Sequence, residues 1–136
     1  MNSVVTLRPI EEDDLGFLFE VYASTREDVN LTDWSRQQKE DFLRMQFLAQ
    51  HDYYQQQFPE AEYSIIMAGD RPIGRLYIDR RPDEICIIDI ALLTGHRGGG
   101  IGGRIVRDLL DEAATAGKPV RIHVLRDSTA LHLYDR

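Results

Sequence analysis

The segment from Arg97 to Gly103 has the composition of a turn that binds an anionic ligand. Five of the six residues from position 98 to 103 are glycine, and the sixth is Ile101. Glycine lets the backbone approach a ligand closely, while the free amides and positive dipole of a helix start favour a diphosphate. The alternative is that the glycines only make a tight turn. In that case they would destabilise the helix start by about 1 kcal/mol per interior glycine, with no ligand to bind. The segment therefore predicts a phosphate-binding site.

The glycine spacing alone leaves two kinds of phosphate ligand open. Gly98, Gly100 and Gly103 satisfy the GxGxxG spacing of dinucleotide-binding folds, and Asp127 follows the next predicted strand. The turn comes late in the chain, however, and too little sequence follows it to build a doubly wound sheet. No Gly-Lys-Ser/Thr follows, which excludes a P-loop. A dinucleotide-binding fragment is therefore the less favoured alternative.

Two acidic residues near the turn are candidates for moving a proton. Asp89 interrupts an otherwise apolar run from Ile85 to Leu93, where burial can adapt a carboxylate to act as a base. A structural carboxylate with hydrogen-bonding partners is the commoner alternative for such a residue. Glu84, at the mouth of the same strand, is a second candidate that would act through a water. Strand alternation places the Cys86 side chain opposite to that of Asp89, and we interpret Cys86 as a core residue.

Apolar residues at helical spacing predict the helices that hold these groups. A first helix extends from Glu11 to Tyr22, and a capping box of Ser35 and Gln38 begins a second one that continues toward Phe58. The second helix is expected to bury Phe42, Met45 and Ala49, and residues 27–34 are expected to form a loop. A third helix runs from Ile101 to a stop at Gly117, with an apolar stripe of Ile105, Val106, Leu109, Leu110, Ala113 and Ala114.

Alternating apolar residues predict the strands. They lie within residues 1–10, 63–67, 74–78, 85–93 and 120–124. The second and third form a hairpin around Gly69 and Asp70, and the fourth is a central strand covered on both faces. The fifth should lie parallel to the fourth through a right-handed crossover. A last short helix begins at Asp127 or Ser128 and carries Tyr134.

Composition narrows the classes of function. The 136 residues fit one domain. The net charge of −7 argues against nucleic-acid binding and favours a cationic ligand that carries an amine. Cys86 is the only cysteine, so no intramolecular disulfide forms, and no Cys/His cluster suggests a metal. His96 and His123 lack partners at metal-ligand spacing, so surface or turn roles are expected. With neither a signal peptide nor a membrane span, we expect a cytoplasmic protein.

The glycine motif and the order of elements resemble the GNAT superfamily of N-acetyltransferases. The family's cofactor motif, Arg/Gln-x-x-Gly-x-Gly/Ala, is matched by Arg97, Gly100 and Gly102, between the strand IDIALLTGH and a helix. The resemblance covers nearly the whole chain. It implies an α/β (α+β) fold in one domain, residues 1–136, with a mixed, mostly antiparallel sheet flanked by helices in the order β-α-α-β-β-β-α-β-α.

The resemblance also implies a cofactor, acetyl-CoA, and a set of residues that bind it without a metal. Backbone amides would bind its pyrophosphate, namely those of Gly98, Gly99, Gly100, Ile101, Gly102 and Gly103, and the motif residue Arg97 is expected to belong to the same cofactor-binding set. Leu92 and Leu93 would pair with the pantetheine arm, and an amide near Ile90 to Leu92 would polarise the thioester carbonyl. Ser128 or Asp127 stands where the family often has an Asn on the cofactor arm, although helix capping explains either residue equally well.

The implied reaction is direct transfer of acetyl to a primary amine in a ternary complex. Tyr134 resembles the family tyrosine that protonates the departing thiolate, the alternative being an aromatic that packs the last helix. Asp89 or Glu84 would take the proton of the amine. The acceptor is a small molecule or a protein amine, and no membrane is involved. A CoA-binding module with impaired catalysis is the second hypothesis.

The chain departs from the family pattern at its C-terminus. Family members usually continue after the tyrosine with Leu-Gly-Phe and one or two strands, whereas this sequence stops at Arg136. Without these C-terminal strands, we expect one side of the sheet and part of the acceptor site to be uncovered. Either the sequence is a truncated form, or a partner chain, such as the second copy of a homodimer, supplies that edge. The lack is expected to affect catalysis more than cofactor binding.

Overall fold

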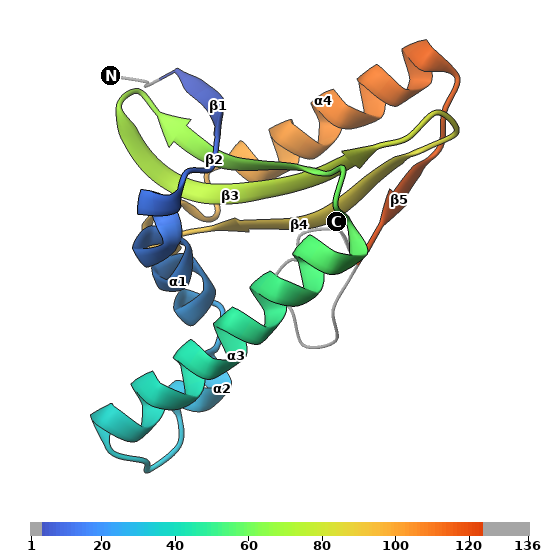
Figure 1. Ribbon diagram of the computed structural model, residues 1–136. Coiled ribbons are helices and arrows are strands. Elements are labelled where there is room, and N and C mark those ends of the chain that lie inside the picture. Colours follow the sequence, from blue (N-terminus) through green and yellow to red (C-terminus); the bar gives the residue numbers. More distant parts are fainter. Residues whose placement is uncertain (1–3, 124–136) are drawn as a thin grey trace.

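Five strands form a single sheet in the computed structural model, which describes residues 4–123 (Figure 1). The strands are β1 (Val5–Pro9), β2 (Glu62–Ala68), β3 (Arg71–Arg80), β4 (Ile85–Leu92) and β5 (Val120–Ile122), and they lie side by side in chain order. The first four pair antiparallel, and β5 pairs parallel to β4. The predicted mixed, mostly antiparallel sheet with its parallel last strand is therefore confirmed.

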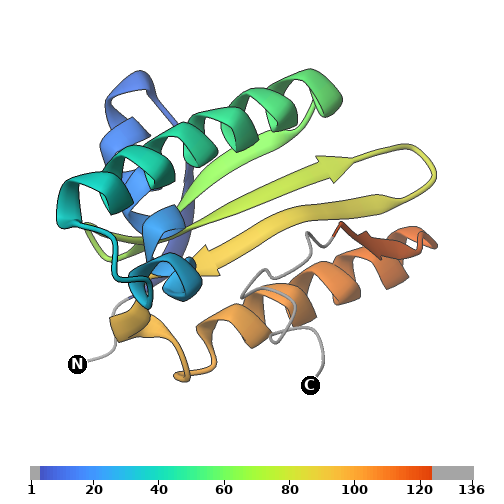
Figure 2. The same cartoon turned by 90° about the horizontal axis from the view of Figure 1, so that it is seen from below.

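Helices cover both faces of the sheet (Figures 1 and 2). One face carries α1 (Leu15–Ser24), α2 (Glu27–Asn30) and α3 (Arg36–Gln57), and the other carries α4 (Ile101–Ala116). Two single 3₁₀ turns, η1 (Glu12–Asp14) and η2 (Thr94–His96), lead into α1 and follow β4. The described elements follow the predicted order, except that the loop expected at residues 27–34 contains the one-turn helix α2.

The capping box of α3 is confirmed, but the predicted buried face of this helix holds only for Phe42, which packs against the core. Ser35 Oγ accepts from the Gln38 amide at 3.1 Å, and Gln38 Oε1 accepts from the Ser35 amide at 2.9 Å. The buried residues of α3 are Leu43, Phe47 and Tyr54, whereas Met45 is 57% exposed and Ala49 is also exposed. Aromatic packing decides which face is buried, because Phe47 contacts the rings of Phe19 and Tyr22.

The helix α4 ends as predicted, with Gly117 in the left-handed region at a φ of 69°. Leu109 and Ala113 pack against the sheet together with Ile105 and Val106. Leu110 is 49% exposed and Ala114 is exposed, so the packed stripe is narrower than expected. Residues one position apart on a helix differ by about 100° in direction, so Leu110 and Ala114 point away from the sheet while Leu109 and Ala113 pack against it.

A bulge in β4 changes which side chains face α3. Tyr77 is opposite Asp89 and the next residue, Ile78, is opposite Ile87, so Ile88 is an extra residue in β4. Cys86 and Ile88 pack with Tyr54 of α3, and Asp89 accepts a hydrogen bond from the same tyrosine. The prediction that Cys86 and Asp89 face opposite ways is therefore wrong, because simple alternation fails across a bulge. Cys86 is nevertheless a core residue, 1% exposed, and burial raises the pKa of its thiol.

Candidate active site

The glycine turn joins the end of β4 to the start of α4, as predicted. Gly98 and Gly100 lie in the left-handed region, with φ values of 79° and 86°, and Gly100 is the residue before the first turn of α4. A Cβ added at either residue, at Gly99 or at Gly103 would meet no atom within 4 Å. The turn therefore has a backbone that glycine alone adopts without strain and an open side that a ligand can approach.

Free amides collect at this turn because α4 starts there. The first helical hydrogen bond runs from the Arg104 amide to the Gly100 carbonyl, at 3.0 Å. The amides of Ile101, Gly102 and Gly103 precede it, so they have no acceptor one turn back within the helix. Such amides, together with the helix dipole, suit a negatively charged group. The structure thus brings together the residues predicted to bind pyrophosphate, and their binding role stays a prediction.

The last residues of β4 direct backbone groups away from β3. The Leu93 amide donates to the Ile73 carbonyl at 2.8 Å, so alternation turns the backbone groups of Ile90 and Leu92 toward the opposite edge. On that edge, the described pairing with β5 ends at Ile87 and Ile122, followed by one bond from the His123 amide to the Ile87 carbonyl. Within residues 4–123, the amides of Ile90 and Leu92 thus lie beyond the paired part of β5. The Leu93 amide is already used by β3.

Asp89 forms a buried ion pair. Its Oδ2 lies 2.7 Å from Arg75 Nη2, and Tyr54 donates to the same oxygen at 3.1 Å. The Nη2 group of Arg75 also donates to Gln50 Oε1 at 2.9 Å. Burial, followed by the charge of Asp89, raises the pKa of Tyr54, so its hydroxyl remains a donor at neutral pH. Asp89 thus has the hydrogen-bonding partners of a structural carboxylate, the commoner alternative for such a residue, and a role as a base stays a prediction.

Three buried polar atoms around Tyr54 lack a hydrogen-bonding partner in the described part of the chain. They are Arg75 Nε, Tyr77 Oη and His123 Nε2. The rings of Tyr77 and His123 lie 5.8 and 6.3 Å from that of Tyr54, in edge-on contact. Arg75 and Tyr77 were not among the predicted site residues, and His123 was expected at the surface or in a turn. The sequence pattern could have placed Arg75 and Tyr77 near this site, because they alternate with the apolar core residues of β3 and so face α3.

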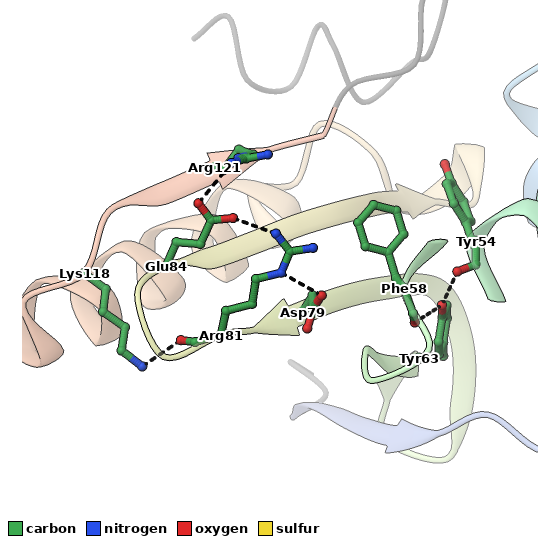
Figure 3. Close-up of polar contacts among 8 residues, drawn as sticks. All are labelled: Tyr54, Phe58, Tyr63, Asp79, Arg81, Glu84, Lys118 and Arg121. Atoms are coloured by element: carbon green, nitrogen blue, oxygen red, sulfur yellow. Dashed lines mark hydrogen bonds and ion pairs between the residues drawn. The ribbon is translucent and has the colours of Figure 1, made fainter. Parts of the chain in front are cut away.

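Glu84 lies at the opposite end of β4 from the glycine turn, among charged partners (Figure 3). Its two oxygens lie 3.0 Å from Arg81 Nη1 and 3.3 Å from Arg121 Nη2. Arg81 also bonds Asp79 at 2.9 Å, and its carbonyl accepts from Lys118 Nζ at 3.0 Å. Asp89 lies five positions after Glu84, which is about 16 Å along a strand. The structure therefore does not bring Glu84 together with Asp89 and the turn.

Some predicted features fall outside what the structure describes. Tyr134 and Ser128, with the alternative Asp127 and the predicted last helix, lie beyond the described residues. Within residues 4–123, no three His, Cys, Asp or Glu side chains are grouped so that they could hold a metal ion. In the same part of the chain, every helix is too short or too polar to cross a membrane.

Comparison with known proteins places this geometry in a family. The model of the acetyltransferase (GNAT) family matches residues 18–136. A search of curated proteins found no significant match. Among solved structures, the PaiA N-acetyltransferase of Thermoplasma acidophilum in complex with coenzyme A is similar, with a TM-score of 0.62 at 15% identity over 97% of this chain and 86% of that chain.

Two further structures show the same fold. A GCN5-related N-acetyltransferase from Rhodopseudomonas palustris has a TM-score of 0.60 at 15% identity, over 99% of this chain and 82% of that chain. A ribosomal-protein-alanine N-acetyltransferase from Brucella melitensis biovar Abortus 2308 has a TM-score of 0.55 at 14% identity, over 97% and 89%. The dinucleotide-binding fragment is no longer a candidate. The chain belongs to the acetyltransferase (GNAT) family, whose members use acetyl-CoA, and is an acyltransferase of the N-acetyltransferase type.

Proposed function

We propose that the protein transfers the acetyl group of acetyl-CoA to a primary amine by direct attack within a ternary complex. The observation that carries this proposal is the open glycine turn placed directly after β4, with the left-handed residues Gly98 and Gly100 at its centre. Backbone amides from Gly98 to Gly103 hold the pyrophosphate of the cofactor. A charged cofactor is thus bound by amides and a helix dipole, without a metal.

The far edge of β4 receives the rest of the cofactor. The amides of Ile90 and Leu92 face away from β3, beyond the paired part of β5. One of them polarises the thioester carbonyl, and Leu92 pairs with the pantetheine arm, with Leu93 adjoining it. A polarised carbonyl develops negative charge when the amine attacks, and a fixed amide stabilises that charge without reorganising. Ser128 contacts the cofactor arm.

The reaction needs one base and one acid. The amine loses a proton, its nitrogen attacks the carbonyl carbon, the new C–N bond replaces the C–S bond, and the thiolate leaves and is protonated. Asp89 remains the proposed base, since it lies at the bulge of β4 near the end of the pairing with β5. Glu84 is less suited, because it lies at the opposite end of β4 from the glycine turn. Tyr134 is the proposed acid.

The acceptor is a small molecule or a protein that presents a primary amine. The net charge of −7 favours a cationic acceptor, because opposite charge increases the rate of encounter. Asp89 is countered by Arg75 within the described structure, so the general charge of the protein, and not this one residue, supports the choice of a cation.

A thermal-shift series tests the cofactor. We expect acetyl-CoA and CoA to raise the melting temperature and NAD to leave it unchanged, because a ligand that binds only the folded state stabilises it by mass action. A shift with NAD alone, or with none of the three, would contradict the proposed cofactor. Release of free thiol from acetyl-CoA with an amine panel then tests transfer. CoA binding without turnover on any amine would favour the CoA-binding module.

A further inference from the structure

Arg97 begins the glycine turn, yet its guanidinium is bound to two other segments. Its Nε donates to the Leu92 carbonyl at 2.8 Å. Its Nη2 donates to Ser24 Oγ at 3.0 Å and to the Ser24 carbonyl at 3.3 Å. Ser24 lies 73 positions earlier in the chain, at the end of α1. One side chain therefore joins the end of β4 and the glycine turn to α1.

The end of α1 is a suitable place for an arginine. The last carbonyls of a helix lack donors within the helix, and the negative end of its dipole attracts a cation. The Ser24 hydroxyl donates to the Val21 carbonyl at 2.7 Å, which leaves its oxygen free to accept from Arg97. Arg97 thus caps α1 through two acceptor atoms of one residue.

These contacts compete with a direct role for Arg97 in binding phosphate. Arg97 is half-buried, and this burial lowers the pKa of its guanidinium, against an opposing effect of the charge on Glu27. If the guanidinium moved out to a phosphate, the oxygens of Leu92 and Ser24 would lose their donor, which is unfavourable for partly buried acceptors. The backbone amides of the turn can bind an anion without that loss.

We propose that Arg97 is a positioning residue that couples occupation of the glycine turn to the end of α1. The inference rests on the proposed function, since CoA is the ligand that occupies the turn. Pyrophosphate bound at the turn fixes the backbone of Arg97, and its guanidinium then holds Ser24 in place. Helix α1 leads into α2 on the sheet face that also carries Asp89, and Figures 1 and 2 show α1 beside the end of β4. Cofactor binding therefore rigidifies the face opposite α4.

Hydrogen–deuterium exchange of the full chain with and without CoA tests the coupling. We expect CoA to slow exchange in the last turn of α1, residues 21–24, by about fivefold or more, the lower end of typical couplings between sites. In Arg97→Met this CoA-dependent slowing is lost although CoA still binds, and in Ser24→Ala it is reduced. Arg104→Met is the matched control, because Arg104 is exposed on the first turn of α4 and loses the same charge. It should keep the full response.

Three outcomes overturn the inference. The first is CoA binding to the unaltered chain with no change in the exchange of α1. The second is loss of CoA binding in Arg97→Met together with an unchanged response in Ser24→Ala, which would make Arg97 a direct phosphate ligand. The third is absence of any CoA binding by the unaltered chain, which also overturns the proposed function. The thermal shift identifies that third case before exchange is measured.

Discussion

Arg75 of β3 and Asp89 of β4 form an ion pair across the sheet, with 2.7 Å between Nη2 and Oδ2. Their side chains are only 4% and 9% exposed. Tyr54 donates to the same carboxylate oxygen, and Gln50 accepts from the same guanidinium nitrogen. The pair thus ties two strands to α3 at the position of the β4 bulge, where the pairing with β5 also ends within residues 4–123.

Removing one member of this pair should cost more stability than removing both. Arg75→Met or Asp89→Leu alone leaves a buried charge without its partner, which typically lowers the free energy of unfolding by about 3–5 kcal/mol. The double variant Arg75→Met/Asp89→Leu leaves neither charge, so its loss should be clearly smaller than the sum of the single losses. Urea denaturation of the four proteins measures this coupling. Additive losses would show that the two residues do not interact energetically.

The hydrogen bond from Tyr54 to Asp89 should also be measurable. Tyr54→Phe removes one donor to a buried carboxylate and should lower the free energy of unfolding by about 1.5–3 kcal/mol. Tyr53→Phe is the matched control on the same helix, since Tyr53 is 46% exposed and should change stability by no more than about 0.5 kcal/mol. Equal effects of the two substitutions in urea denaturation would argue against a role of Tyr54 in holding Asp89.

Substitutions of the glycines at the two ends of α4 should distinguish backbone strain from loss of ligand binding. Gly100 and Gly117 both have positive φ, at 86° and 69°, so Gly100→Val and Gly117→Val should each lose about 1–2 kcal/mol of stability or somewhat more. Only Gly100→Val should also lose the melting-temperature rise caused by CoA, because only Gly100 lies in the proposed pyrophosphate site. A retained CoA response in Gly100→Val, or its loss in both variants, would contradict the assignment.

The stability that Asp14 contributes to the fold should be lost in acid. Arg8 donates to both Asp14 oxygens at 2.8 Å, and these bonds, opposed by burial, lower the pKa of Asp14 below its ordinary value of 3.8. Because the unfolded chain binds this proton more readily, Asp14 contributes stability above pH 3.8 that is lost as pH falls through the lower folded pKa.

The variant Asp14→Asn isolates this contribution. We expect it to lower the free energy of unfolding by about 1 kcal/mol at pH 7, a reduced figure because Arg8 is 38% exposed. The difference from the unaltered protein should shrink toward zero as the pH falls below 3.8 and through the lower folded pKa of Asp14. Unfolding curves collected across this range check it. A difference that stays constant with pH would show that Asp14 stabilises the fold without its charge.

Features with local causes could be predicted from the sequence. The glycine turn, the Ser35/Gln38 capping box, the stop at Gly117 and the parallel order of β4 and β5 were all predicted, because each depends on neighbouring residues or on chain connectivity. The family resemblance, based on Arg97, Gly100 and Gly102, was confirmed by the family match.

Features set by contacts between distant segments were missed. The bulge at Ile88 depends on how β4 pairs with β3, and strand alternation gave no sign of it, so Cys86 was placed on the wrong face. The buried face of α3 was set by aromatic rings of α1, which favoured Phe47 over Met45. Asp89 pairs with Arg75 and Tyr54, 14 and 35 positions away, and Arg97 binds Ser24, 73 positions away, beyond the reach of any local pattern.

Titration of the ¹⁵N-labelled chain with CoA, followed by amide NMR, tests the central claim most directly, and the mass of 15.7 kDa suits the method. The proposed site predicts that the largest chemical-shift changes occur at residues 98–103 and at the amides of Ile90 and Leu92. Changes centred elsewhere, for example around Glu84 at the other end of β4, would contradict the placement of the cofactor. Absence of any change at saturating CoA would contradict cofactor binding itself.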